Sequence, residues 1–337
     1  MLGSILQYQR FFRNLYLIMF KSILLIGATR VGGFGDYVAQ ELARDSSHFT
    51  RIAFFNNTSR PADDSKKARI RDLQVQGFEI VEAADYGSPE PYKGFDCVLI
   101  FLGNHGLYLQ PTIIDAAIQA GVRHFYPSEY GADITVGQNW TQRYYKYKVE
   151  TRQHLEARAR DIPDLGWTLY LLGRLTEWSV MSHFGFDNKN ATAQIYGTAA
   201  GRQSLVSAVD SAKYLVETLK EPLNDAGKGS KRTYRISGSN TTYGEIFEIL
   251  ERVTGRKYDV TYLPVESTRE EETQAQKAGD VDAELSASHK LIQGREGTLL
   301  PEPWDNDRFP SVHPKGVEEA LREAFASERL KKAYGFD

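Results

Sequence analysis

"KSILLIGATRVGGFG", residues 21–35, joins a short apolar run to a glycine-rich turn near the start of the chain. The run is typical of a buried strand, and "DYVAQELARD" (36–45) after it has the apolar spacing of a helix. The segment therefore predicts a strand, a tight turn and a helix. Glycines in this context indicate a dinucleotide site, because the turn brings a ligand to the N-terminus of the helix.

The residues of the turn have separate expected roles. Gly27 permits the sharp bend, and Gly33 is expected to let the helix pack closely on the strand. Arg30 stands where the usual fingerprint has its middle glycine, but a guanidinium can itself pair with a phosphate. The predicted contacts to the coenzyme in this turn are Gly27, Thr29, Arg30, Val31, Gly32 and Gly33.

The strand-and-helix pattern recurs along the first half of the chain. Apolar runs at 51–57, 77–83, 95–103 and 122–128 alternate with helical stretches at 65–76 and 109–121. Such alternation predicts an α/β fold with a doubly wound parallel sheet, Rossmann-like, with helices on both faces. We expect a nucleotide-binding domain over 21–160 and a smaller C-terminal α/β substrate-binding region over 161–337, mixed with late elements of the first sheet.

The second half of the chain has fewer strand-like runs and longer polar connections than the first half. Strand-like runs at 166–173 and 232–238 remain, a Thr-capped helix is predicted over 241–255, and 315–335 is expected to form one amphipathic helix. The connections 178–203 and 267–293 look polar and irregular, which is typical of lids and binding loops. Trp178, His183 and Phe184, with Phe186 nearby, are candidates for an apolar substrate wall; a small satellite core explains them equally well.

Composition excludes several classes of partner. A net charge of −3 and a pI near 6.2 provide no basic field for nucleic acid. The single Cys97 lies in an apolar run and is expected to be a buried hydrophobe, and no spacing of His, Cys, Asp or Glu suggests a metal site. Residues 1–20 faintly resemble a targeting or membrane-surface helix, but charge interrupts them and they are too short to span a bilayer. We interpret them as an N-terminal extension and expect a cytoplasmic protein.

The end of the second predicted strand indicates which nicotinamide coenzyme is used. An acid there would bind the ribose hydroxyl of NAD, but "FFNNTSRP" (54–61) has none. Asn57, Arg60, Lys66 and Lys67 follow instead, and basic side chains suit the 2'-phosphate of NADP(H). The alternative is that the two lysines are a solvated first turn of the next helix.

"RYYKYKVETRQHLE" (143–156) places Tyr144 four residues before Lys148 in a predicted helix. On one helix face the ammonium would lower the pKa of the phenol and make it a usable proton donor. Ser128, at the carboxyl end of the strand at 122–128, lies where ligands of such sheets bind. Tyr144 is otherwise a surface aromatic, and Tyr145 or Tyr147 is equally available. Leu102 and Gly103 after the fourth strand are predicted to contact the coenzyme, and His105 either lines this groove or is polar surface.

Three of these segments together resemble a known family. "LLIGATRVGGFG", "HFYPSEYGAD" and "KVETRQHLE" are similar to segments of the isoflavone reductase and NmrA-like group, which are atypical short-chain dehydrogenases/reductases. The resemblance implies NADPH-dependent reduction of a carbonyl or conjugated C=C in a small, often aromatic, secondary metabolite, with Lys148 as the catalytic lysine. Tyr144 departs from the plant reductases of the group and makes Ser128, Tyr144 and Lys148 a candidate triad. The alternative is a non-catalytic NADP-sensing regulator of the NmrA kind that binds a protein partner. The substrate and the oligomeric state stay open.

Overall fold

The computed structural model describes residues 19–59, 61–223 and 229–336, so the predicted extension lies almost wholly outside the described residues. The predicted doubly wound sheet is confirmed. Seven parallel strands lie in the order β11-β6-β5-β4-β1-β2-β3. They are β1 (Ser22–Ile26), β2 (Arg51–Asn57), β3 (Glu79–Ala83), β4 (Cys97–Ile100), β5 (His124–Tyr126), β6 (Gly166–Leu171) and β11 (Lys231–Arg235).

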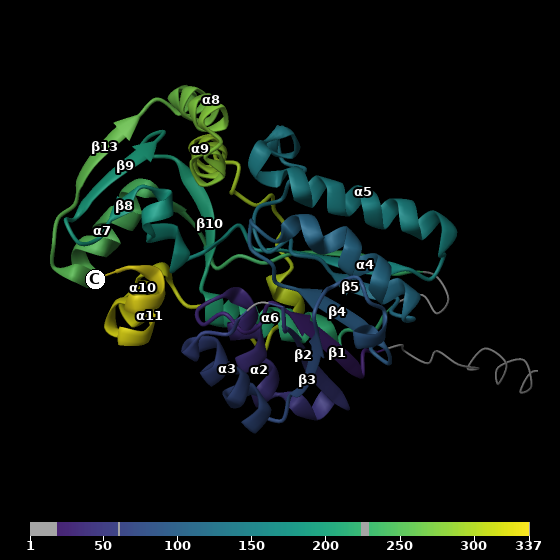
Figure 1. Ribbon diagram of the computed structural model, residues 1–337. Helices are drawn as coiled ribbons and strands as arrows, with labels where there is room; N and C mark the ends of the chain where they lie inside the picture. The colour runs from purple at the N-terminus through teal and green to yellow at the C-terminus, as the bar shows by residue number, and fades with distance from the viewer. Residues whose placement is uncertain (1–18, 60, 224–228, 337) are drawn as a thin grey trace, which may run out of the picture.

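Helices cover both faces of this sheet, as Figure 1 shows. Ile23 and Leu25 of β1 face one core with α2 (Phe34–Arg44), α3 (Asp64–Val75) and α6 (Ala208–Lys220). Leu24 and Ile26 face a second core with α4 (Gln110–Gln119) and α5 (Lys146–Asp161). The alternation follows from the period of two in a strand, and burial on both faces explains the continuous apolar runs in the sequence. Cys97 is fully buried in the first core, as predicted.

Two small sheets stand beside the large one (Figure 1). In the first, β10 (Arg202–Val206) pairs with β7 (Arg174–Leu175) and β12 (Ser239–Thr242). In the second, β9 (Thr192–Tyr196) pairs with β8 (Phe186–Asp187) and β13 (Asp259–Leu263). The expectation of an irregular segment at 178–203 was therefore wrong, because tertiary pairing organises these short strands.

The second predicted excursion is also folded. It contains α8 (Thr268–Ala278) and α9 (Val281–Gly294), which pack against each other. The helix predicted over 241–255 is α7 (Tyr243–Thr254), with Thr242 as its cap in a complete capping box. Among the described residues, no helix is long and apolar enough to cross a membrane.

The C-terminal segment forms two helices where the sequence predicted one. They are α10 (Val317–Ala326) and α11 (Glu328–Tyr334), and Ser327 separates them with extended backbone at φ −92° and ψ 112°. The Ser327 side chain caps α11 by accepting from the Leu330 N–H. The break turns α11 toward the glycine turn that follows β1, where Tyr334 donates to the carbonyl of Gly32 at 3.3 Å.

Candidate functional site

A cavity of about 200 Å³ opens at the carboxyl ends of the central strands. This is the edge where open parallel sheets bind their ligands. The glycine turn, the segment after β4 and the segment after β5 form one side of the cavity. The other side comes from the start of α5, the β6–β7 connection and α9. We call this space the reaction cavity.

The glycine turn is packed tightly against the end of β4. Gly27 has φ 91°, and a Cβ there would lie 2.5 Å from the carbonyl oxygen of Phe101. The close-packing role predicted for Gly33 belongs instead to Gly35, where a Cβ would lie 2.9 Å from the Phe101 side chain. A Cβ on Gly33 would lie 3.0 Å from the carbonyl of Arg30, so that glycine serves the turn itself. Only residues without a side chain allow this approach.

Lys148 lies on α5 with its side chain buried in the wall of the reaction cavity. Its Nζ donates to the backbone carbonyl of Glu129 at 3.1 Å, and the Glu129 carboxylate is taken by Arg152, with contacts of 2.9 and 2.8 Å. Burial lowers the pKa of Lys148 to about 8, against the attraction of the nearby Glu129. Gly131 leaves the space for the ammonium, because a Cβ there would lie 3.2 Å from Nζ.

Ser128 lies at the end of β5 and also lines the reaction cavity. Its hydroxyl donates to the carbonyl of Leu102 at 2.8 Å, and its N–H donates to the Gln110 side chain at 2.7 Å. These bonds fix the hydroxyl between the ends of β4 and β5. Its oxygen offers lone pairs to a ligand, since the proton is already donated.

Tyr144 lines the reaction cavity but does not share a helix face with Lys148. Residues Arg143–Tyr145 form a 3₁₀ turn, and α5 begins only at Lys146, so the i,i+4 geometry assumed from the sequence does not apply. The Lys148 Nζ lies 5.3 Å from the ring of Tyr145 instead. Tyr144 stacks on His289 of α9 with ring centroids 4.1 Å apart. Burial raises the pKa of Tyr144, and a hydrogen bond with Asn104 opposes the shift, so the predicted lowering was wrong.

The predicted substrate wall is only partly in place. Trp178 and Phe184 line the reaction cavity, whereas His183 packs against Phe184 with ring centroids 4.8 Å apart and is not among the lining residues. His105 is exposed and pairs with Asp282 of α9 at 2.8 Å, which agrees with the polar-surface alternative. Leu102 and Gly103, the predicted coenzyme contacts after β4, line the reaction cavity.

Among the lining residues that the sequence did not single out are Asn104, Arg174 and His289. Asn104 follows a predicted strand and could have been found by its position. Arg174 and His289 carry no local signal, because β7 and α9 reach the cavity only through tertiary packing.

A second cavity of about 560 Å³ lies over the outer side of the glycine turn, and we call it the phosphate cleft. Arg30 lines both this cleft and the reaction cavity. Lys66 lines the cleft, with Nζ 3.5 Å from the carbonyl of Asn57. The residues that line the cleft are Thr29, Arg30, Val31, Asp63, Ser65, Lys66, Arg329, Lys332 and Ala333.

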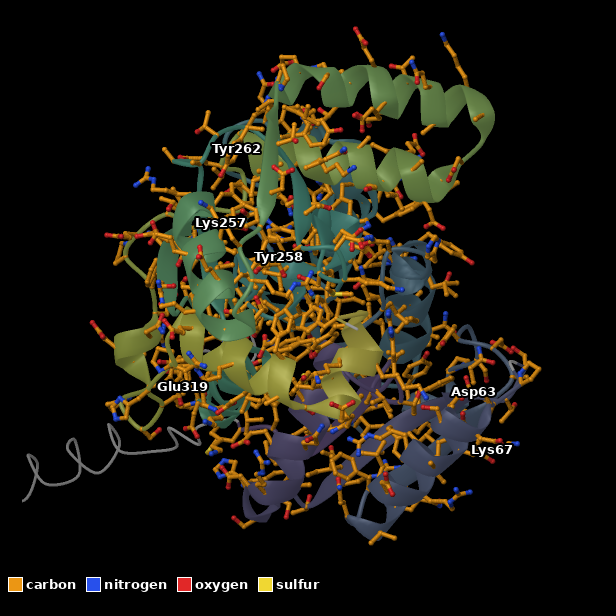
Figure 2. The ribbon with its side chains drawn as sticks, turned by 90° about the vertical axis from the view of Figure 1, so that its left-hand side faces the viewer. Asp63, Lys67, Lys257, Tyr258, Tyr262 and Glu319 are labelled. Atoms are coloured by element: carbon orange, nitrogen blue, oxygen red, sulfur yellow. The ribbon has the colours of Figure 1, made fainter. Side chains whose placement is uncertain are left out.

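Two predicted coenzyme residues lie apart from this cleft. Lys67 pairs with Asp64 at 3.4 Å near the start of α3, where Figure 2 labels it beside Asp63, and it does not line the cleft. Asn57 turns its side chain to Ser59, whose N–H and hydroxyl it accepts at 2.9 and 2.6 Å. Arg60 lies outside the described residues.

The C-terminal helix is tied to the glycine turn by a buried carboxylate. Asp36 in α2 is fully buried and lies 2.7 Å from both Arg69 and Arg329, the latter on α11. It also accepts the Gly32 N–H at 3.0 Å. A Cβ on Gly32 would lie 3.1 Å from Ala333. The basic face of α11 is thereby held beside the turn, although no sequence pattern connected the two.

The two adjoining cavities fit a dinucleotide. The glycine turn joins them, and the phosphate cleft carries four cationic side chains against one carboxylate. That balance suits phosphates at one end, and the aromatic and apolar lining of the other suits a nicotinamide and a small substrate. Within the described ranges, no group of three His, Cys, Asp or Glu side chains is arranged to hold a metal ion.

Fold and site together define a Rossmann-like protein with a dinucleotide-sized site at the edge of its sheet. The chain belongs to the NmrA-like family, whose model matches residues 19–281. This confirms the resemblance read from the three motifs.

Characterised relatives are distant in sequence. The chain is 26% identical over 250 residues to the oxidoreductase aprR of Aspergillus flavus, covering 73% of this chain and 78% of that protein. It is 26% identical over 230 residues to the oxidoreductase poxI of Penicillium oxalicum, covering 66% and 71%.

Solved structures share the fold at lower identity. A leucoanthocyanidin reductase–NADPH complex from Vitis vinifera has a TM-score of 0.71 at 18% identity, with 91% of this chain and all of that chain covered. The NADPH-dependent quinone oxidoreductase QOR2 of Escherichia coli, complexed with NADPH, has a TM-score of 0.64 at 17% identity, with 90% and 99% covered. At this level of identity the likeness establishes the architecture.

Proposed function

We propose that this protein is an NADPH-dependent reductase that transfers hydride to a carbonyl or conjugated C=C of a small, largely aromatic molecule. The observation that carries the proposal is Lys148, a buried ammonium with a pKa near 8 in the wall of the reaction cavity. A purely structural lysine is seldom buried without a carboxylate of its own. Here the nearest acid, Glu129, is taken by Arg152, so the Lys148 proton is available to the cavity.

The coenzyme would be held by the glycine turn and the phosphate cleft. Arg30 and Lys66 would meet its phosphates, and Lys332 would meet them from α11. Lys148 would contact the nicotinamide ribose at the other end. When bound, NADPH supplies the hydride. The absence of an acid after Asn57 and the surplus of cations favour NADP(H) over NAD(H).

The side chains of the reaction cavity would have separate roles in the reduction of the substrate. Because burial raises the pKa of Tyr144, its hydroxyl keeps its proton and would act as a hydrogen-bond donor to the developing oxyanion. Lys148, with a pKa near neutrality, would deliver the proton, to oxygen in a carbonyl reduction or through the enolate in a C=C reduction. Ser128 would position the ligand by its lone pairs. The balance is one substrate, one NADPH and one proton giving reduced product and NADP⁺.

The names of relatives support this class of activity. Those in Aspergillus flavus and Penicillium oxalicum are called oxidoreductases, and the neighbouring structures from Vitis vinifera and Escherichia coli hold NADPH. Fungal relatives also make a secondary metabolite a reasonable substrate.

The test is NADPH oxidation with a panel of enones, quinones and aryl ketones. For any substrate that turns over, Lys148→Met should lower kcat/KM by roughly 100-fold, the usual scale of general acid catalysis, while NADPH binding measured by fluorescence changes less than threefold. Lys146→Met is the matched control, because that lysine is exposed in the first turn of the same helix and pairs with Glu150.

Two outcomes would contradict the proposal. Unchanged turnover in Lys148→Met would remove the assignment of Lys148. Tight NADPH binding with no turnover on any member of the panel would favour the regulator instead.

A further inference from the structure

Arg174 is a buried cation that lines the reaction cavity and not the phosphate cleft. It opens β7 directly after Gly173, which has φ 67° and packs so closely that a Cβ would lie 2.5 Å from the carbonyl of Ser204. Only 5% of Arg174 is exposed, yet it is among the residues that line the cavity. The glycine and the pairing of β7 with β10 therefore fix a guanidinium inside the protein.

A second buried arginine shows how such a charge is ordinarily compensated. Arg69 is also 5% exposed, and its guanidinium lies 2.7 Å from the buried carboxylate of Asp36. For Arg174, no carboxylate of residues 19–59, 61–223 or 229–336 lies within ion-pair distance. Its hydrogen-bond partners are the side chains of Gln203 and Tyr243 and the carbonyl of Ser179, the last at 3.2 Å. The Gln293 amide, in one of its two orientations, adds an oxygen at 3.0 and 3.1 Å.

These uncharged partners accept hydrogen bonds from the Arg174 guanidinium, but they do not compensate its positive charge. The guanidinium also lies 4.1 Å above the ring of Phe184, which is a weak interaction by comparison with an ion pair. Removing an unpaired charge from water is strongly unfavourable, so buried charges are nearly always paired. Consistent with this, burial lowers the pKa of Arg174.

The lining of the cavity has the same one-sided charge. Arg30, Lys148 and Arg174 contribute three cations, and no aspartate or glutamate is present among the described lining residues. Arg30 and Lys148 face the proposed coenzyme, which leaves Arg174 without an assigned anion. An anionic group on the other ligand would supply it.

His289 provides an independent observation beside Arg174. Its side chain is buried in the cavity wall, and its Nδ1 has no hydrogen-bond partner in the described part of the chain. Its ring lies between Tyr144, at 4.1 Å, and Phe184, at 4.9 Å. A buried ring nitrogen without a partner points to a polar group supplied by a ligand, and the neighbouring rings point to an aromatic body.

We propose that Arg174 binds a carboxylate of the substrate, so that the protein acts on small aromatic acids, with His289 as the polar neighbour of that group. This inference deepens the proposed reductase function and rests on it, because the bound acid is a substrate only if the protein is a reductase. A guanidinium suits a carboxylate because both are planar and the hydrogen bonds are charge-assisted.

The test uses benzoate and benzamide, which match in shape and differ in charge, and measures equilibrium binding by calorimetry. We expect wild type to bind benzoate at least tenfold more tightly than benzamide, and Arg174→Gln to lose that preference. Arg235→Gln is the matched control, because Arg235 pairs with Asp133 at 2.8 Å and does not line the cavity. No preference in wild type, or an equal preference in Arg174→Gln, would overturn the proposal.

A second measurement needs no change at Arg174. The imidazole signals of His289, assigned by comparison with His289→Gln, should move on titration with benzoate and stay in place with benzamide. Unmoved signals with benzoate would also overturn the proposal. Neither measurement uses NADPH or turnover. Failure of the reductase assay and failure of benzoate binding can therefore be distinguished.

Discussion

The charges at the two ends of the site stand in opposite environments. In the phosphate cleft, Arg30 and Lys332 are exposed and Lys66 is half-buried. In the reaction cavity, Lys148 and Arg174 are buried. Exposed charges are screened by salt, whereas burial shifts the pKa of a charged group and makes it depend on specific partners. The difference suggests that one end selects the coenzyme by charge and the other controls protons and the substrate.

The largest expected effect concerns the pH dependence of the reaction cavity. Because the pKa of Lys148 is about 8, the proton-bearing form is present below that pH and is lost above it. If Lys148 is the acid, kcat/KM should fall about tenfold per pH unit above pH 8. Lys148→Arg stays protonated and should lose this alkaline limb, even if its overall rate is lower. If kcat/KM of Lys148→Arg still falls above pH 8, the fall belongs to another group. The contrast between buried charges in the reaction cavity and exposed charges in the phosphate cleft would then be weaker.

A buried carboxylate next to Trp178 in the cavity wall tests, through protein stability, whether burial controls the charge of a side chain here. Glu177 is 4% exposed, and its oxygens accept the Ala208 N–H at the start of α6, at 3.2 and 3.0 Å. Burial raises the pKa of Glu177 to about 7, above its ordinary value of 4.5. The folded state therefore binds more protons than the unfolded state between these values, and stability is lost as pH rises through that window.

Glu177→Gln removes the titration. From pH 4.5 to pH 8, its free energy of unfolding should rise by roughly 3 kcal/mol relative to wild type, measured by urea denaturation. The exposed Glu302→Gln should show no such trend. A constant difference across this range would mean that burial does not set the charge state here.

The smallest expected effect is at the phosphate cleft. Lys66→Ala and Lys332→Ala should each weaken NADPH binding by about tenfold or less, since one charge-assisted contact at a partly exposed site contributes about 1 kcal/mol. NADH binding should be nearly unchanged, and the loss should shrink at high salt. Lys67→Ala is the matched control, because it is paired with Asp64 outside the cleft. Equal effects at Lys66 and Lys67 would show that the cleft does not read the 2'-phosphate.

The local features of the site were readable before the structure was known. The glycine turn, Ser128 and the residues after β4 were predicted because each lies at the end of an apolar strand, and the ends of parallel strands meet at one edge. Lys148 was predicted from its spacing to Tyr144 and from the family resemblance. The relation of Tyr144 to Lys148 was predicted wrongly, because a regular helix was assumed through a segment whose first turn is 3₁₀. Lys66 and Lys67 were considered together, because a sequence does not show which of two neighbours in the first turn of a helix faces a cleft.

The sequence by itself determined the doubly wound sheet, because apolar periodicity acts over a few residues. Its motifs also indicated the family, and they predicted a candidate site at the carboxyl ends of the strands. Only the tertiary structure decided what encloses that site. Arg174, His289 and α11 reach it from segments far along the chain, and the burial that changes the pKa of Lys148 exists only once those segments pack around it.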